Sequence, residues 1–417
     1  MKRLLCIVLC LLTVLSLVAC SQTPEPTTEA TEATGGYEYP KIQELLTWER
    51  LNAFPVKSSD MTVDELRELC VEFFRFTKNA LWTPSETKQY IKSSNGPDEV
   101  TQGTIYGGLP YVTLGTGNLY RLMDYIDEAT GVVDIRNAMA NPKYFGNQCS
   151  IGSYWPWARV INSADFQWTY NMIYANGFLP IGPYTYDITQ PRFTDIYTTE
   201  MVCRDNGEQI MYQSYAQLLP ADGLVQSVDE YGHAVMCSSV AHVEYTENGE
   251  IDGEKSYITI IDQHGKWVER TNESGDVFYH KNYLDSKRTF AKLYADYYVP
   301  FTFGEFQGTD PVEETECNFS YTGDTITVSD LFKTKVTSNY GISDVYAIVK
   351  DSEGNEVYRH AARCQRAGEM EIELKRNSDY IVKWGTLDVS TGDFTVEIVV
   401  QLGTGERPTI YTGKLVP

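Results

Sequence analysis

The first 36 residues of this chain cannot contribute to a folded core. Residues 1–20 have two basic residues directly after Met1, continue with an apolar run to Val18 and contain no acidic residue. This pattern is typical of a secretory signal, and the apolar run is short for a membrane span. Residues 21–36 consist mainly of Thr, Glu, Pro, Ala and Gly, which cannot bury enough apolar surface to become ordered. Folding is therefore left to roughly 380 residues, a length that predicts two or more domains.

The end of the signal has a motif of its own. Leu17-Val18-Ala19-Cys20 resembles the lipobox of bacterial lipoproteins. The resemblance implies that Cys20 is lipidated and becomes the mature N-terminus, with residues 21–36 as a disordered tether. We therefore expect a lipid-anchored protein on the extracytoplasmic side of a bacterial cell membrane, which it contacts only through Cys20.

The charge of the chain excludes some partners. There are 34 Lys and Arg against 57 Asp and Glu, a formal net charge of -23. Removing the signal with Lys2 and Arg3 takes this to -25. Such a charge argues against nucleic acid and polyanionic surfaces as partners, and it also helps to keep an exported protein soluble. We expect a monomer.

The cysteines do not form a recognisable framework. After Cys20 they are Cys70, Cys149, Cys203, Cys237, Cys317 and Cys364. Their spacing is irregular and includes no C-x-x-C pair, so neither a disulfide framework nor a zinc site is indicated. Pairing of Cys317 with Cys364 outside the cell stays open. We expect no metal and no cofactor.

Three segments with different patterns follow the tether, and together they predict an α+β chain. Residues 37–100 form a helical N-terminal region, in which Thr62 to Glu65 is a capping box before an apolar periodicity. Residues 101–308 mix helical and strand patterns, with a helix expected over 118–129. Residues 309–417 contain short alternating strands, which predict an immunoglobulin-like β-sandwich.

Cys149 is the candidate nucleophile. It follows Gly146-Asn147-Gln148 and precedes a Trp-rich segment, 150–160, that we expect to be helical. The first turn of a helix favours a thiolate because of its unpaired amides and its dipole. Gly152 and Pro156 do not suit a helix interior, and Pro156 predicts a kink or an early end.

A base and an acid follow Cys149 in the sequence. His233 comes after Gly232 at the start of an apolar strand, where a base would face a cleft, and Asp262 ends the next strand. If the two strands turn at Asn248-Gly249, Asp262 lies opposite Val235 and diagonal to His233, within reach of its ring.

Other registers lead to other partners for His233. A turn at Asp252-Gly253 would place Asp262 opposite Val243, too far from His233. Gln263 and His264 therefore remain as alternatives to Asp262. For the rest of the site, we expect Tyr106, Tyr111 and Trp155 to line the cleft. Backbone amides at Gln148 and Cys149, with the Gln148 side chain, would hold an oxyanion.

Several of these residues carry a family resemblance. The segments 218–225, Leu-Leu-Pro-Ala-Asp-Gly-Leu-Val, and 232–236, Gly-His-Ala-Val-Met, are similar to the signature of the NlpC-type papain-like superfamily. Tyr106 to Tyr111 and Cys149-Ser150 resemble two further elements of that family. The chain departs from the pattern at Ala221-Asp222-Gly223, where the family has Gly-Asp, and at Ile151, where it has Gly.

The resemblance implies a papain-like domain over 101–308 that works as a cysteine peptidase or amidase on peptidoglycan stem peptides. Cys149 would be the nucleophile, His233 the general base and Asp262 the residue that orients the imidazole. Two alternatives stay open. A transglutaminase-like acyl-transfer enzyme uses Cys, His and Asp in the same order, and a non-catalytic surface lipoprotein could bind a glycan or peptide in the same cleft.

Overall fold

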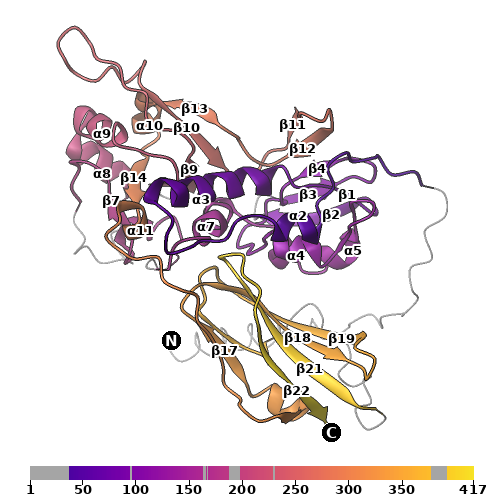
Figure 1. The fold of residues 1–417 in the computed structure, drawn as a ribbon. Helices are drawn as coiled ribbons and strands as arrows, with labels where there is room; N and C mark the ends of the chain where they lie inside the picture. Colours follow the sequence, from indigo (N-terminus) through magenta and orange to yellow (C-terminus); the bar gives the residue numbers. More distant parts are fainter. Residues whose placement is uncertain are drawn as a thin grey trace, which may run out of the picture. The chain divides into compact units, whose positions relative to one another are not determined.

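The structure, a computed structural model, describes residues 37–93, 96–162, 166, 168–186, 198–228, 231–376 and 392–417 (Figure 1). The chain divides into two compact units, Met1–Tyr39 and Pro40–Pro417. Every element named below belongs to the second unit, which is a mixed α+β fold with several sheets. The predicted signal with Cys20 and the predicted tether lie outside the described residues.

The N-terminal segment begins with helices and continues with strands. Its elements are α2 (Trp48–Asn52), α3 (Val63–Lys78), β1 (Leu81–Pro84), β2 (Lys88–Ser93) and β3 (Gly96–Val100). Helix α3 starts at the predicted capping box, with Thr62 and Glu65 each accepting a backbone hydrogen bond from the other. The predicted helical region 37–100 is wrong beyond Lys78. Strand β1 is buried along its whole length, and a short, fully buried strand has no alternation that would distinguish it from a helix.

Strand β1 lies inside a six-stranded sheet with the order β11-β12-β4-β1-β6-β5. Its other members are β4 (Tyr106–Gly107), β5 (Ile126–Asp127), β6 (Val132–Val133), β11 (Val268–Thr271) and β12 (Val277–His280). Helix α4 (Leu119–Met123) follows the N-cap Asn118, as predicted, but it ends at Met123 because the chain then enters β5. The short helices α5 (Ile135–Ala138) and α6 (Pro142–Phe145) complete this part.

A second six-stranded sheet has the order β13-β10-β9-β8-β14-β7, and all its pairs are antiparallel. Its strands are β7 (Leu179–Pro180), β8 (Gly223–Val228), β9 (Tyr231–Cys237), β10 (Tyr257–Asp262), β13 (Ser286–Thr289) and β14 (Val299–Thr302). The helices of this part are α7 (Cys149–Trp157), η1 (Met172–Tyr174), α8 (Thr199–Asn206), α9 (Glu208–Tyr215), α10 (Phe290–Ala295) and α11 (Gly304–Gln307). Helices α3 and α7 lie together against this sheet, which shares one large apolar core with them (Figure 1).

The register of β9 and β10 confirms one of the two predicted pairings. Asp262 lies opposite Val235. The connection between the strands turns at the predicted dipeptide, where Gly249 has a φ of 81° and its amide donates to the Thr246 carbonyl. Because side chains two residues apart share a face of a strand, this pairing puts the Asp262 carboxylate diagonal to His233.

The C-terminal segment forms two further sheets. The smaller contains β15 (Cys317–Phe319), β17 (Lys335–Ser338) and β20 (Glu371–Glu373). The larger contains β16 (Thr325–Thr327), β22 (Thr409–Val416), β21 (Phe394–Leu402), β18 (Ile342–Lys350) and β19 (Glu356–Arg363), with the short helix α12 (Val328–Leu331) after β16. Apolar residues of both sheets share one core with residues of α7. The short strands predicted for residues 309–417 are present in these two sheets.

A buried ion network connects α4 to the larger C-terminal sheet. The Arg121 guanidinium donates to both oxygens of Asp344, at 3.0 and 3.2 Å, and neither side chain is exposed. Arg363 joins Asp344, at 3.1 Å, to Asp124, at 2.9 Å. The network therefore links residues that are more than two hundred positions apart in the chain.

Replacing Asp344 with Ala tests this link. The change would leave the guanidinium groups of Arg121 and Arg363 buried without their shared carboxylate, so we expect the free energy of unfolding to fall by about 3–5 kcal/mol. Chemical denaturation measures it. Asp393→Ala is the control, because it removes a carboxylate from an exposed pair with Lys414 and is expected to leave the unfolding midpoint in place. If the two variants lower the free energy of unfolding equally, the buried network does not stabilise the fold more than an exposed ion pair does.

Candidate active site

Cys149 is the first residue of helix α7, one residue before the predicted start. Gln148 precedes it as the N-cap, and all nine residues of the helix are buried. Pro156 is accommodated because the helix ends one residue later, at Trp157, which confirms the predicted early end. Gly152 is required by packing, since a Cβ there would lie 2.8 Å from Cβ of Gln263. Tertiary contacts thus override the poor helix propensity of both residues.

His233 and Asp262 face each other across β9 and β10. The His233 Nε2 atom lies 2.9 Å from Asp262 Oδ2, and both side chains are almost completely buried. The second carboxylate oxygen accepts a hydrogen bond of 2.7 Å from the Tyr283 amide. Because Nε2 is engaged by the carboxylate, Nδ1 is the ring nitrogen left for the thiol of Cys149.

The thiol lies at β9, with its sulfur 3.9 Å from the Gly232 carbonyl oxygen. Burial alone would raise the pKa of Cys149, but the hydrogen bond and the charge of His233 outweigh burial and hold this pKa below its ordinary value. Burial likewise opposes a charged His233, yet its bonds with Asp262 and Cys149 raise the pKa of the imidazole to about 10. The pKa of Asp262 is lowered, chiefly by His233 against the effect of burial. These directions favour a thiolate and an imidazolium over a wide pH range.

The two alternative partners of His233 lie elsewhere. Gln263 donates to the Leu109 carbonyl, at 2.9 Å, and accepts a short hydrogen bond from the Lys78 ammonium. His264 accepts from the Lys266 amide through Nδ1, at 3.1 Å, and its ring stacks on Tyr283. Burial lowers the pKa of His264 to about 4, so this ring is neutral near pH 7. Of the three residues considered, Asp262 is the one that contacts His233.

A cleft of about 1010 Å³ opens over these residues. Cys149, His233 and Asp262 all line it, as do the predicted residues Tyr111 and Gln148. Burial raises the pKa of Tyr111, and a hydrogen bond with Cys149 raises this pKa further, so the phenol stays protonated beside the thiol. The side-chain amide of Gln148 accepts from the Leu114 amide at 3.0 Å and donates to Ser150 Oγ at 3.2 Å.

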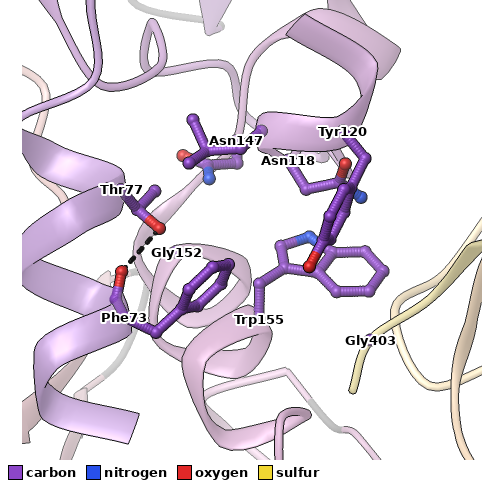
Figure 2. A pocket seen from close by; sticks show the side chains of 9 residues that line it. Phe73, Thr77, Asn118, Tyr120, Asn147, Gly152, Trp155 and Gly403 are labelled. Atoms are coloured by element: carbon purple, nitrogen blue, oxygen red, sulfur yellow. Dashed lines mark hydrogen bonds between the residues drawn. The ribbon is translucent and has the colours of Figure 1, made fainter. Parts of the chain in front are cut away.

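Two predicted cleft residues lie in the core instead. Tyr106 is 4% exposed, stacks on Trp82 and accepts a hydrogen bond from the Thr101 amide. Trp155 belongs to the core beneath the C-terminal sheets and borders a separate cavity of about 10 Å³, beside Tyr120 and Gly403 (Figure 2). That cavity has room for about one water molecule and cannot take a substrate. Both predictions were wrong because the type of an aromatic residue does not show to which side of its helix or strand the ring points.

The cleft also contains aromatic residues that the sequence analysis did not single out. They are Trp168, Tyr170, Tyr231, Tyr283 and Tyr298. Tyr231 had a usable signal, because it lies two residues before His233 on the same strand and therefore on the same face. The others lie in turns and loops, where no periodicity indicates a direction.

Lys78 is a further buried group near the site. It is the last residue of α3 and is 1% exposed. Its ammonium donates a hydrogen bond to the side chain of Gln263, the residue that follows β10. Burial lowers the pKa of its ammonium to about 7, against the opposing charge of Asp262. Because Gln263 follows Asp262 directly, Lys78 helps to hold the end of β10 in place.

The cysteines Cys317 and Cys364 are both free thiols, so the open question of their pairing is answered in the negative for this structure. The Cys364 sulfur instead accepts a hydrogen bond of 3.1 Å from the Arg121 guanidinium. Across the described ranges, no group of three or more His, Cys, Asp or Glu side chains is arranged to hold a metal ion.

Comparison with known protein families, with curated proteins and with solved structures finds no match to this chain. Within the part of the chain that the structure describes, no helix combines the length and the apolar character needed to cross a bilayer.

The pKa directions predict how Cys149 reacts with iodoacetamide as the pH changes. A thiolate reacts and a thiol does not, so a cysteine of ordinary pKa loses about tenfold in rate for each pH unit below its pKa. Because the pKa of Cys149 is lowered, its rate is expected to fall less between pH 8 and pH 6 than that of a cysteine with an ordinary pKa. Cys317, whose pKa is raised by burial, serves as the internal control and should lose rate steadily over the same interval. Peptide mass spectrometry reports both sites, and parallel decline of the two would contradict the thiolate.

Proposed function

We propose that this protein is a cysteine peptidase or amidase of the papain-like, NlpC-type kind. The observation that carries the proposal is the alignment of three groups along one cleft. Cys149 begins a buried helix, His233 lies beside its sulfur, and the Asp262 carboxylate holds the other ring nitrogen at 2.9 Å. A nucleophile, its base and a residue that orients the base are the parts that acyl-transfer chemistry needs.

The proposed reaction starts from the thiolate and imidazolium pair. The Cys149 thiolate attacks the carbonyl carbon of an amide, and the oxygen becomes negatively charged. The backbone amides at Gln148 and Cys149, at the start of α7, would stabilise that charge. His233 then transfers the proton on Nδ1 to the leaving amine, which releases one product and leaves a thioester on Cys149.

Water completes the cycle. Neutral His233 takes a proton from a water molecule, whose oxygen attacks the thioester carbon and releases the carboxylic acid. Throughout, Asp262 accepts the Nε2 hydrogen and keeps Nδ1 directed at the reacting atoms. The Tyr283 amide fixes the carboxylate in turn, so the imidazole has one preferred orientation.

The motif that carries the family resemblance also supports this proposal. Ala221, at the position where the family has Gly, adopts a left-handed φ of 68°, a conformation that favours glycine. Its carbonyl accepts a hydrogen bond of 2.7 Å from the Trp157 indole, and the following Asp222 pairs with Arg67 at 2.8 Å. The motif therefore packs the start of β8 on the helix that begins with Cys149.

The cellular setting follows from the N-terminal sequence. We propose that lipidated Cys20 anchors the enzyme on the extracytoplasmic side of a bacterial membrane, where stem peptides of peptidoglycan are the available amides. The C-terminal sheets share their core with α7, and we propose that they form an immunoglobulin-like accessory domain. The three residues of the site, the family resemblance and the proposed membrane anchor together make cell-wall hydrolysis the activity that we favour.

Single substitutions test the assignment of roles. Cys149→Ala is expected to abolish hydrolysis of purified peptidoglycan, because no nucleophile remains. His233→Ala should reduce the rate about 10²–10⁴-fold through loss of the proton transfer. Asp262→Asn should reduce kcat with little effect on KM, because the ring loses its orientation and the stabilisation of its charge.

The readout is the release of free amino groups together with mass spectrometry of the soluble products. Cys317→Ala, at a free thiol outside the cleft, is the control and should retain full activity. Incorporation of a labelled amine into a glutamine-containing acceptor, without muropeptide cleavage, would favour a transglutaminase-like enzyme instead. Tight glycan or peptide binding that Cys149→Ala leaves unchanged, with no hydrolysis by the wild type, would favour a binding protein.

A further inference from the structure

Lys78 is a buried cation that the proposed reaction does not use. Its side chain lies beside the first turn of α7, where a Cβ on Gly152 would come within 3.6 Å of the Lys78 Nζ atom. Among the described residues the ammonium forms no ion pair, and its hydrogen bond goes to the neutral side chain of Gln263. An ammonium buried in this way is unfavourable unless an opposite charge lies near it.

The opposite charge near Lys78 is that of Asp262. Burial lowers the pKa of the ammonium, and the Asp262 carboxylate acts in the opposite direction. Asp262 directly precedes Gln263, and neighbouring side chains of a strand point to opposite faces. The Gln263 amide also donates to the Leu109 carbonyl at 2.9 Å, which fixes its oxygen toward Lys78. The ammonium is therefore held behind the strand end that carries the Asp262 carboxylate.

Two histidines also lie within reach of the charge of Lys78. His264 follows β10, and His280 ends β12. Burial, together with the charge of Lys78, lowers the pKa of each ring to about 4. Both rings are neutral near pH 7, so neither of them replaces Lys78 as a positive charge beside Asp262.

The reacting groups need a positive charge in this place. A Cys149 thiolate, a His233 imidazolium and an Asp262 carboxylate sum to one negative charge, and all three groups are buried. An uncompensated negative charge in a buried site disfavours the ionised thiol and the ionised carboxyl group. The Lys78 ammonium brings the sum to zero.

We propose that Lys78 is a positioning residue whose buried ammonium balances the charge of Cys149, His233 and Asp262 and so keeps the thiolate and the carboxylate ionised. This inference rests on the proposed function and adds a residue to the same site. Lys78 does not line the cleft, so it acts through these groups and not on the substrate. Because the pKa of Lys78 is about 7, its support weakens as the pH rises through neutrality.

Substitutions of Lys78 separate its charge from its hydrogen bond. Lys78→Gln is neutral but keeps a donor for Gln263, whereas Lys78→Arg keeps both the donor and the charge. The rate of Cys149 with iodoacetamide is measured by peptide mass spectrometry from about pH 4 to about pH 9. Loss of the positive charge disfavours the thiolate, so Lys78→Gln is expected to raise the midpoint of this profile by roughly half a pH unit to one unit. Lys78→Arg should keep the midpoint at or below that of the wild type.

Lys333→Gln is the matched control. It removes one exposed cation of the C-terminal region and changes the net charge of the chain equally, so the midpoint should stay in place. If Lys78 supplies only a hydrogen bond, Lys78→Gln keeps the wild-type midpoint and the proposal is overturned. If Lys78→Gln and Lys78→Arg raise the midpoint alike, packing rather than charge is responsible, and the proposal is overturned as well.

A second measurement needs no substitution of Lys78. By linkage, Asp262 affects the titration of Lys78 as strongly as Lys78 affects that of Asp262. Lysine labelled at Nζ is followed by NMR through a pH titration of the wild type and of Asp262→Asn. Lys78 is recognised because it titrates well below the ordinary lysine value of about 10.4. We expect its pKa to fall by about one unit in Asp262→Asn. An unchanged pKa, or a wild type in which every lysine titrates near the ordinary value, would overturn the proposal.

The outcomes separate the role of Lys78 from the proposed function. If Cys149 of the wild type reacts with iodoacetamide no faster than Cys317 near neutral pH, the proposed function fails. If Cys149 is reactive but the midpoint of its profile is the same in the wild type and in Lys78→Gln, the thiolate stands and the role of Lys78 fails.

Discussion

The complete burial of helix α7 is the constraint on which the rest of the structure depends. All nine of its residues are buried, and different faces pack into different cores. Ile151, Tyr154 and Trp155 belong to the core of the C-terminal sheets, while Trp157 belongs to the core of the six-stranded sheet that carries His233. A helix that is apolar on every side has to be enclosed by several partners. The position of the Cys149 sulfur is thereby set by the two cores together.

The charges of the site depend on that enclosure. Burial alone would raise the pKa of Cys149 and lower that of His233, so each ion would be unfavourable without the other. Asp262 is the third charge that makes the pair stable, and it is held by the Tyr283 amide. The thiolate and the imidazolium are shielded from bulk water, so they attract each other more strongly than they would in solvent. The fold and the reactivity are thus consequences of the same packing.

The sequence was sufficient for the residues whose spacing has a geometric meaning. Of the two turn positions considered, Asn248-Gly249 gave the pairing of Asp262 with Val235 that the structure has, and the capping box at Thr62 marked the start of α3. The sequence was not sufficient where contacts between residues far apart in the chain determine the position of a side chain. Lys78 lies 185 residues from Gln263, its partner, and nothing local connects them. The aromatic residues of the cleft were equally ambiguous, because side-chain type alone does not show which way a ring points.

The protonation of His233 tests the central claim most directly. Nitrogen chemical shifts of the imidazole, followed through a pH titration of the labelled wild-type protein, report both ring nitrogens. We expect both nitrogens to carry protons at pH 7 and the proton on Nδ1 to be lost only near the raised pKa of about 10. Titration near the ordinary value of about 6.5, with a neutral ring at pH 8, would contradict it.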